Sequence, residues 1–107
     1  MRILEFDVVK QRLKKRPGCD FTGLVAGSVG YLHAKFHFLE NDWNSCTDKI
    51  ARFWLNDEEH AVRLDKGNVC EIPPEVLTNT MFQVSVIGVA PGYKIETNKI
   101  TVRQGVH

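Results

Sequence analysis

The sequence is poor in cysteine and has no long apolar run. Its three cysteines, Cys19, Cys46 and Cys70, are odd in number and widely spaced, which excludes a disulfide scaffold, and no Cys-x-x-Cys pair suggests zinc. We interpret them as small, buried or half-buried hydrophobic residues. The N-terminal segment MRILEFDVVKQRLKKR is too polar for a signal peptide or a membrane span. These absences predict a protein made in a cytosol, which stays there or leaves by lysis, and which has no membrane partner.

A predominance of charge of one sign is also missing. The 107 residues include 14 Lys and Arg against 13 Asp and Glu, so the net charge is +1 and no strong overall field selects a polyanionic partner. The hydrophobic fraction of 43% and the charged fraction of 25% are typical of a folded globular protein. This length predicts a single domain spanning residues 1–107, with one hydrophobic core.

Catalytic signatures are absent as well. The sequence has no Gly-x-Ser-x-Gly nucleophile elbow, and Gly27-Ser28-Val29-Gly30 is no phosphate loop, because it lacks the Lys-Ser/Thr end and no helix follows it. The acidic run Asp57-Glu58-Glu59 falls in a predicted hairpin turn, where solvated charge is normal. We therefore expect no enzyme, no catalytic residue and no cofactor.

What the sequence does have is alternation. Leu32 to Phe53 reads LHAKFHFLENDWNSCTDKIARF, in which two alternating strands flank a turn at Asp42-Trp43-Asn44. We interpret this stretch as an antiparallel unit with a tryptophan at its corner. Similar strands follow at turn signals spaced ~8–12 residues apart, and no segment longer than one turn is convincingly helical. The fold class predicted is all-β: an Ig-like antiparallel β-sandwich of about seven to nine short strands.

A common inward phase on separate strands defines the expected core. Its members are Phe36, Phe38, Trp43, Phe53, Phe82, Val84 and Val86.

Three outward side chains are more apolar than a solvated face needs. They are Ile50, Trp54 and Ile87, and we predict that they form an interface, with Lys14, Lys15 and Arg16 as a polar rim. An outward Trp54 admits three interpretations: a subunit contact, a carbohydrate platform, or packing under a neighbouring loop.

The basic run at residues 10–16, KQRLKKR, could contact phosphates. However, no aromatic residues interleave with it, and acidic residues elsewhere cancel its charge. We therefore interpret it as a solvated edge or a protein–protein contact, and we expect no nucleic-acid partner. Lysines on an exposed β edge also protect it against aggregation.

The hydrophobic framework resembles a family of small structural domains from tailed phages and prophages of Gram-positive bacteria. The resemblance covers about residues 31–104. It rests first on Ala34-Lys35-Phe36-x-Phe38, Asp42-Trp43 and Lys49-Ile50-Ala51-x-Phe53. It continues in Cys70-x-Ile72-Pro73-x-Glu75-Val76-Leu77, Phe82-x-Val84-Ser85-Val86-x-Gly88 and Thr97-Asn98. The pattern is similar to the N-terminal domain of upper baseplate or tail-fibre proteins of siphophages.

That resemblance implies a non-enzymatic virion structural protein of the tail or baseplate, made in the bacterial host cytoplasm. Its expected partners are other tail or baseplate proteins and further copies of itself. In such proteins the domain often precedes a longer fibre, whereas this chain stops at His107, so we expect a docking role rather than receptor binding. The alternative is a carbohydrate-binding adhesin module in which Trp54 or Tyr93 stacks on sugar.

The pair His33 and His37 generates a negative prediction. On a helix this spacing would place two zinc ligands on one face, but on a strand it separates them by roughly 13 Å, too far to share one ion. Calorimetric titration with zinc should therefore give no stoichiometric site in the micromolar range. A tight one-to-one site that disappears in His33→Ala would contradict both the strand and this conclusion.

Overall fold

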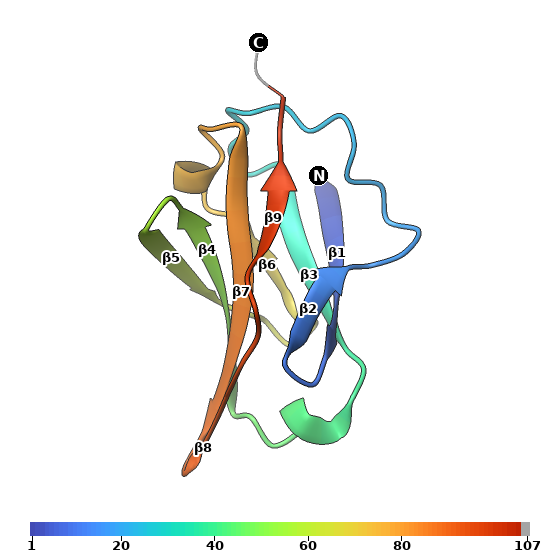
Figure 1. Ribbon diagram of the computed structural model, residues 1–107, viewed down its shortest axis with the longest axis vertical. Helices are drawn as coiled ribbons and strands as arrows, with labels where there is room; N and C mark the ends of the chain where they lie inside the picture. Colours follow the sequence, from blue (N-terminus) through green and yellow to red (C-terminus); the bar gives the residue numbers. More distant parts are fainter. Residues whose placement is uncertain (106–107) are drawn as a thin grey trace.

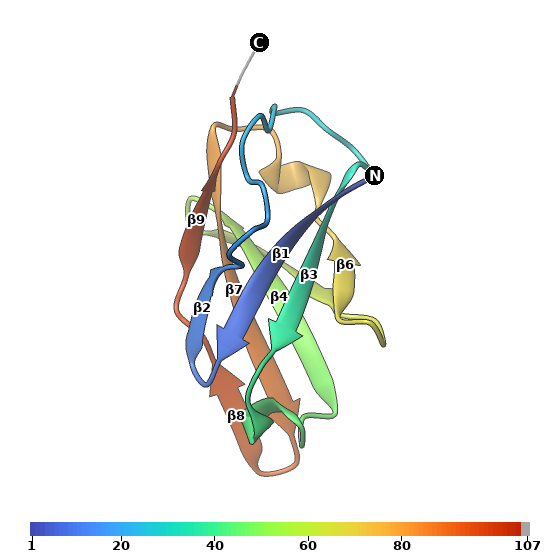
Figure 2. The same cartoon turned by 90° about the vertical axis from the view of Figure 1, so that its right-hand side faces the viewer.

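The computed structural model describes residues 1–105 and consists of two β-sheets packed face to face (Figures 1 and 2). This described part of the chain contains nine strands and two single 3₁₀ turns. The order is β1 (Arg2–Val9), β2 (Arg12–Lys15), β3 (Leu32–Phe38), η1 (Asn41–Trp43), β4 (Asp48–Leu55), β5 (Glu58–Arg63), β6 (Val69–Glu71), η2 (Pro74–Val76), β7 (Met81–Ala90), β8 (Tyr93–Glu96) and β9 (Ile100–Arg103). The predicted all-β, Ig-like sandwich is confirmed.

The four-stranded sheet has the order β2-β1-β3-β6, and the five-stranded sheet has the order β5-β4-β7-β8, with β9 also paired to β7. One pairing departs from the antiparallel expectation, because β1 and β3 run parallel from Arg2 beside Leu32 to Val8 beside Phe38. The long connection over residues 16–31 makes this possible by returning the chain to the start of the sheet (Figure 2).

The stretch from Leu32 to Phe53 is not one antiparallel unit, which corrects the prediction. Both of its strands exist, but β3 belongs to the four-stranded sheet and β4 to the five-stranded sheet. The chain crosses between the sheets at η1, near the lower end of Figure 1. Alternation reveals which side chains face the core, and it says nothing about which strand is the neighbour.

One other local expectation needs correction. The residues Glu58, Glu59 and His60 belong to strand β5, so the hairpin turn is shorter than predicted. Asn56 adopts a left-handed φ of 56° in that turn, a conformation that asparagine tolerates well.

The core lies between the sheets and contains the predicted residues. Phe36, Trp43, Phe53, Phe82, Val84 and Val86 are all buried in one cluster, and Phe38 is half-buried and packs against it. Aromatic contacts run along the inner face of each sheet. In the four-stranded sheet the Phe6 ring stacks on Phe36 with centroids 5.2 Å apart, and in the five-stranded sheet the Phe53 and Phe82 centroids lie 6.4 Å apart.

Trp43 is fully buried at the crossover between the sheets. Its ring lies against Phe38, with centroids 5.0 Å apart, and its indole N–H donates a 2.8 Å hydrogen bond to the Lys10 carbonyl in the β1–β2 turn. A Cβ added at Gly88 would lie 2.8 Å from the indole ring, so β7 can approach the tryptophan only because this residue is glycine.

Asn98 joins the two sheets at the β2 edge. Its side-chain oxygen accepts a 2.8 Å hydrogen bond from the Leu13 N–H, and its amide nitrogen donates to the Leu13 carbonyl at 3.3 Å. Its own backbone N–H donates to the Gln11 carbonyl. One side chain thus satisfies a donor and an acceptor that an edge strand would otherwise expose.

Truncating the crossover tryptophan should strongly destabilise the domain. Removing a buried tryptophan typically costs about 3–5 kcal/mol, so Trp43→Ala should unfold the protein or lower its melting temperature by well over ten degrees. Trp43→Phe keeps an aromatic ring but loses the hydrogen bond to the Lys10 carbonyl. Its melting temperature, measured by circular dichroism, should therefore lie between those of wild type and Trp43→Ala. A melting temperature of Trp43→Ala within about two degrees of wild type would contradict the role given to this residue.

Candidate interaction surface

The outer face of the five-stranded sheet carries the three apolar residues predicted to form an interface. Strands β4 and β7 pair so that Ile50 lies directly beside Ile87, and Trp54 lies on the same face beside Gln83. These positions alternate with Ala51 and Phe53, which are buried in the core. All three predicted residues are half-buried.

Trp54 is held in place on this face. Its indole N–H donates a 3.1 Å hydrogen bond to Ser85 Oγ, and Ser85, although on the outer face of β7, is fully buried. The Lys99 ammonium lies 3.7 Å from the centre of the Trp54 ring and the Arg52 guanidinium 5.3 Å from it. Both contacts have cation–π geometry, so the tryptophan is partly covered by cations rather than presented bare.

Ion pairs surround the adjacent isoleucines. Arg52 contacts Glu96 at 2.6 Å, across from β4 to β8, and Arg63 contacts Asp48 at 2.6 Å between β5 and β4. The half-buried pair Ile50 and Ile87 therefore lies within a charged frame on a flat sheet face. Such a combination of apolar centre and charged rim is typical of protein interfaces.

The predicted basic rim lies elsewhere. Lys14 and Lys15 belong to β2, at the edge of the other sheet, and are exposed; Arg16 follows them and forms a 2.7 Å ion pair with Asp7. The structure therefore does not bring Lys14, Lys15 and Arg16 together with the Trp54 face. The cations beside Trp54 are Arg52, two residues earlier on the same face of β4, and Lys99, from the connection between β8 and β9. Alternation places Arg52 on this face, whereas the position of Lys99 depends on how distant segments meet in the fold.

The two aromatic residues proposed to stack on sugar lie on different faces. Tyr93 pairs with Ala90, which places it on the core side of the five-stranded sheet, and its hydroxyl donates a 2.7 Å hydrogen bond to the Asp42 carbonyl. Trp54 lies on the outer side under Lys99. They do not form a common aromatic platform.

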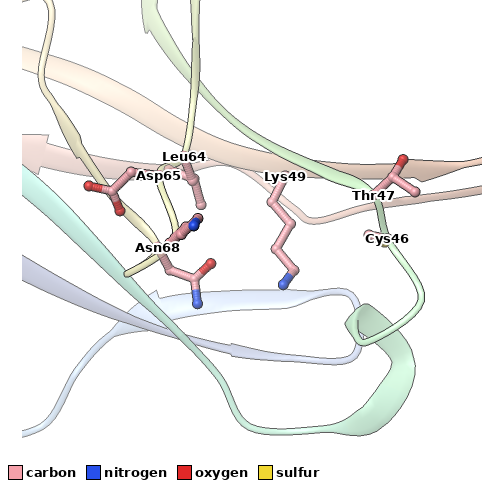
Figure 3. A pocket seen from close by; sticks show the side chains of 7 residues that line it. Cys46, Thr47, Lys49, Leu64, Asp65 and Asn68 are labelled. Atoms are coloured by element: carbon pink, nitrogen blue, oxygen red, sulfur yellow. The ribbon is translucent and has the colours of Figure 1, made fainter.

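A small pocket opens between the β3–β4 crossover and the β5–β6 turn (Figure 3). Its volume is about 150 Å³, and its lining consists of Cys46, Thr47, Lys49, Leu64, Asp65, Lys66 and Asn68. The Asp65 carboxylate is engaged within the turn, where one oxygen accepts hydrogen bonds from the N–H groups of Gly67 and Val69. Ligand pockets usually measure about 300–1,000 Å³, so this space is small for an organic substrate.

The thiols of Cys46 and Cys70 are poorly reactive. Burial raises the pKa of Cys46, and Lys49 lowers it only in part. Burial also raises the pKa of Cys70 to about 12, with Asp65 adding to the shift. Because the thiolate is the nucleophilic form, both residues stay neutral and poorly reactive near pH 7. All three cysteines are unpaired.

The histidines are separate from one another. His33 and His37 lie on β3, as predicted, and His37 Nε2 contacts Glu5 Oε1 at 2.7 Å. His60 contacts Glu58 within β5 at 2.9 Å, and His107 lies outside the described residues. Within residues 1–105, no three His, Cys, Asp or Glu side chains gather in a way that could hold a metal ion.

The comparisons with known proteins do not identify a relative. No family model matches the chain, and no curated protein matches it. Within the described part of the chain, no helix is long and apolar enough to cross a bilayer.

The buried thiol of Cys70 predicts a specific alkaline instability. The folded state keeps this thiol protonated up to a pKa of about 12, against an ordinary value of 9.0. In the unfolded chain the thiol loses its proton first, so its contribution to stability is complete below pH 9.0 and is lost as the pH rises towards 12. The difference between these two pKa values corresponds to about 4 kcal/mol of unfolding free energy.

Urea unfolding between pH 8 and 11 should therefore show a shallower loss of unfolding free energy in Cys70→Ala than in wild type. Val76→Ala, which truncates a buried residue that cannot ionise, should be less stable than wild type and keep its pH dependence. Parallel curves for wild type and Cys70→Ala would contradict the assigned shift.

Proposed function

We propose that this domain is a non-enzymatic structural module of a phage or prophage tail or baseplate. It joins other tail proteins, including copies of itself, by docking. It is made in the bacterial host cytoplasm and ends up in the virion. The resemblance of residues 31–104 to upper baseplate and tail-fibre domains suggests the virion location.

The outer face of the five-stranded sheet is the observation that carries the docking role. Ile50 and Ile87 lie side by side there, framed by the ion pairs Arg52–Glu96 and Arg63–Asp48. Burying two isoleucine side chains contributes about 1.5–3 kcal/mol each only where they were exposed before, so this half-buried patch supports a weak contact. Weak contacts suffice in a ring, because each subunit contributes several at once.

The carbohydrate-binding alternative receives less support. Sugar stacking needs an accessible aromatic face, whereas Lys99 lies over the Trp54 ring and the Tyr93 hydroxyl is bonded to Asp42. The two rings also lie on opposite sides of the sheet.

A substitution at Ile87 tests the docking role. In Ile87→Lys the new ammonium can pair with Glu96, which lies directly opposite on β8, so the strand should persist. We expect at least a tenfold loss of the protein from purified tailed particles made by the strain that carries the gene, measured by quantitative immunoblot, because a desolvated charge would replace an apolar contact.

Val29→Lys is the matched control, since Val29 is 74% exposed in the connection between β2 and β3 and should be incorporated like wild type. Absence of the wild-type protein from purified particles would overturn the proposed location. Equal incorporation of Ile87→Lys and wild type would remove this face from the docking surface.

A further inference from the structure

Charges are segregated on this molecule although they nearly cancel overall. Exposed cations gather on the β1–β2 hairpin, and we call this the basic edge: Lys10, Arg12, Lys14 and Lys15. None of these four joins an acidic side chain in an ion pair within residues 1–105. A hollow of about 400 Å³ beside Val9, Arg12 and Lys14 makes part of this edge concave.

Exposed carboxylates gather on the opposite edge, which we call the acidic edge: Asp57, Glu58, Asp65, Glu71 and Glu75. They come from the β4–β5 turn, β5, the β5–β6 turn, β6 and η2. Some of this charge is offset nearby. Arg63 is already paired with Asp48, but Lys49 and Lys66 line the same pocket as Asp65. The five carboxylates still outnumber these two lysines.

The strand order places these two edges on opposite sides of the sandwich. Strand β2 ends the four-stranded sheet on one side and β6 ends it on the other, while β5 ends the five-stranded sheet. The ribbon views agree: β2 lies across the molecule from β5 in Figure 1 and from β6 in Figure 2. One surface therefore carries about as much positive charge as the opposite surface carries negative charge.

We propose that copies of this chain associate edge to edge, with the basic edge of one copy against the acidic edge of the next. The partner surface is present on the same chain, which favours a second copy over any other acidic macromolecule. The contact uses two different patches, so it is heterologous and generates a ring or a filament rather than a closed pair. This inference deepens the proposed function and rests on it for the biological setting.

The contact should be electrostatic rather than a strand addition. Asn98 already occupies the Leu13 N–H and carbonyl, so a partner strand cannot extend the sheet along β2 at this point. Side-chain attraction between exposed groups is screened within about 8 Å at physiological ionic strength. Association should therefore strengthen at low salt and weaken at high salt.

Paired charge reversals test the proposal in sedimentation velocity over a concentration series at about 20 mM and about 500 mM NaCl. Arg12→Glu with Lys14→Glu cancels the net charge of the basic edge, because two carboxylates then stand beside its two remaining cations. Glu58→Lys with Glu71→Lys leaves the acidic edge with three carboxylates against two new lysines. Each double variant alone should self-associate at least about tenfold more weakly than wild type, equivalent to 1.4 kcal/mol. Mixed together, the two should form complexes again, because the first variant keeps an unchanged acidic edge and the second keeps an unchanged basic edge.

Glu40→Lys with Asp42→Lys is the matched control for the acidic-edge variant, because both raise the net charge by four and both control residues are exposed near the η1 end of the sandwich. This control should associate like wild type, and circular dichroism should show that all variants are folded. A wild type that stays monomeric at low salt and high concentration overturns the inference. A control as defective as the edge variants, or a mixture that does not recover association, also overturns it.

Two further outcomes separate this inference from its alternatives. Self-association that disappears in Ile87→Lys and survives both charge reversals would assign the contact to the outer sheet face; the proposed function would stand and the edge contact would not. A monomeric wild type that binds a random-sequence DNA duplex, with loss only on reversal of Arg12 and Lys14, would assign the basic edge to nucleic acid and overturn the proposal.

Discussion

The position of Trp43 is the constraint on which the rest of the structure depends. This single buried ring lies at the crossover between β3 and β4 and packs against β7 at Gly88. Its indole N–H donates a hydrogen bond to the Lys10 carbonyl in the β1–β2 turn. Lys10 adopts a φ of 54°, an unfavourable conformation for a residue with a side chain, and its carbonyl is thereby tied to the indole. Three segments from distant parts of the sequence thus meet at one side chain.

The seven predicted core residues all lie in the core or pack against it, because burial is encoded in the alternation of β3, β4 and β7. That prediction did not include the core residues of β1, which are Leu4, Phe6 and Val8. The neighbours of each strand could not be predicted. The parallel pairing of β1 with β3 and the assignment of β3 and β4 to different sheets depend on the path of the connecting segments, which leaves no periodic signal. The candidate surface has the same limit. The outward phase of Ile50, Trp54 and Ile87 was predictable, whereas the contact of Lys99 with Trp54 and the burial of Ser85 arise from segments that meet only in the fold.

Charge illustrates the same limit. A net charge of +1 indicated no strong field, yet the fold sorts the charged residues onto opposite edges, so the molecule is dipolar even though it is almost neutral. The basic run was visible in the sequence because its members are consecutive. The acidic edge was not visible, because its five carboxylates come from five separate elements that the topology brings to one side. The net charge only sums the charged residues, whereas association depends on where those residues lie on the surface.

The hydrogen bonds between Asn98 and Leu13 have a consequence for biosynthesis. These residues are 85 positions apart, and β9 pairs with the centre of the second sheet, so the sandwich cannot close until nearly all of the described chain has left the ribosome. Until then the β1–β2 hairpin lacks the side chain that covers its edge. Folding is therefore expected to follow synthesis rather than accompany it, as contacts of high sequence separation generally require. In this interval the lysines of β2 would protect the uncovered strand from pairing with another nascent chain.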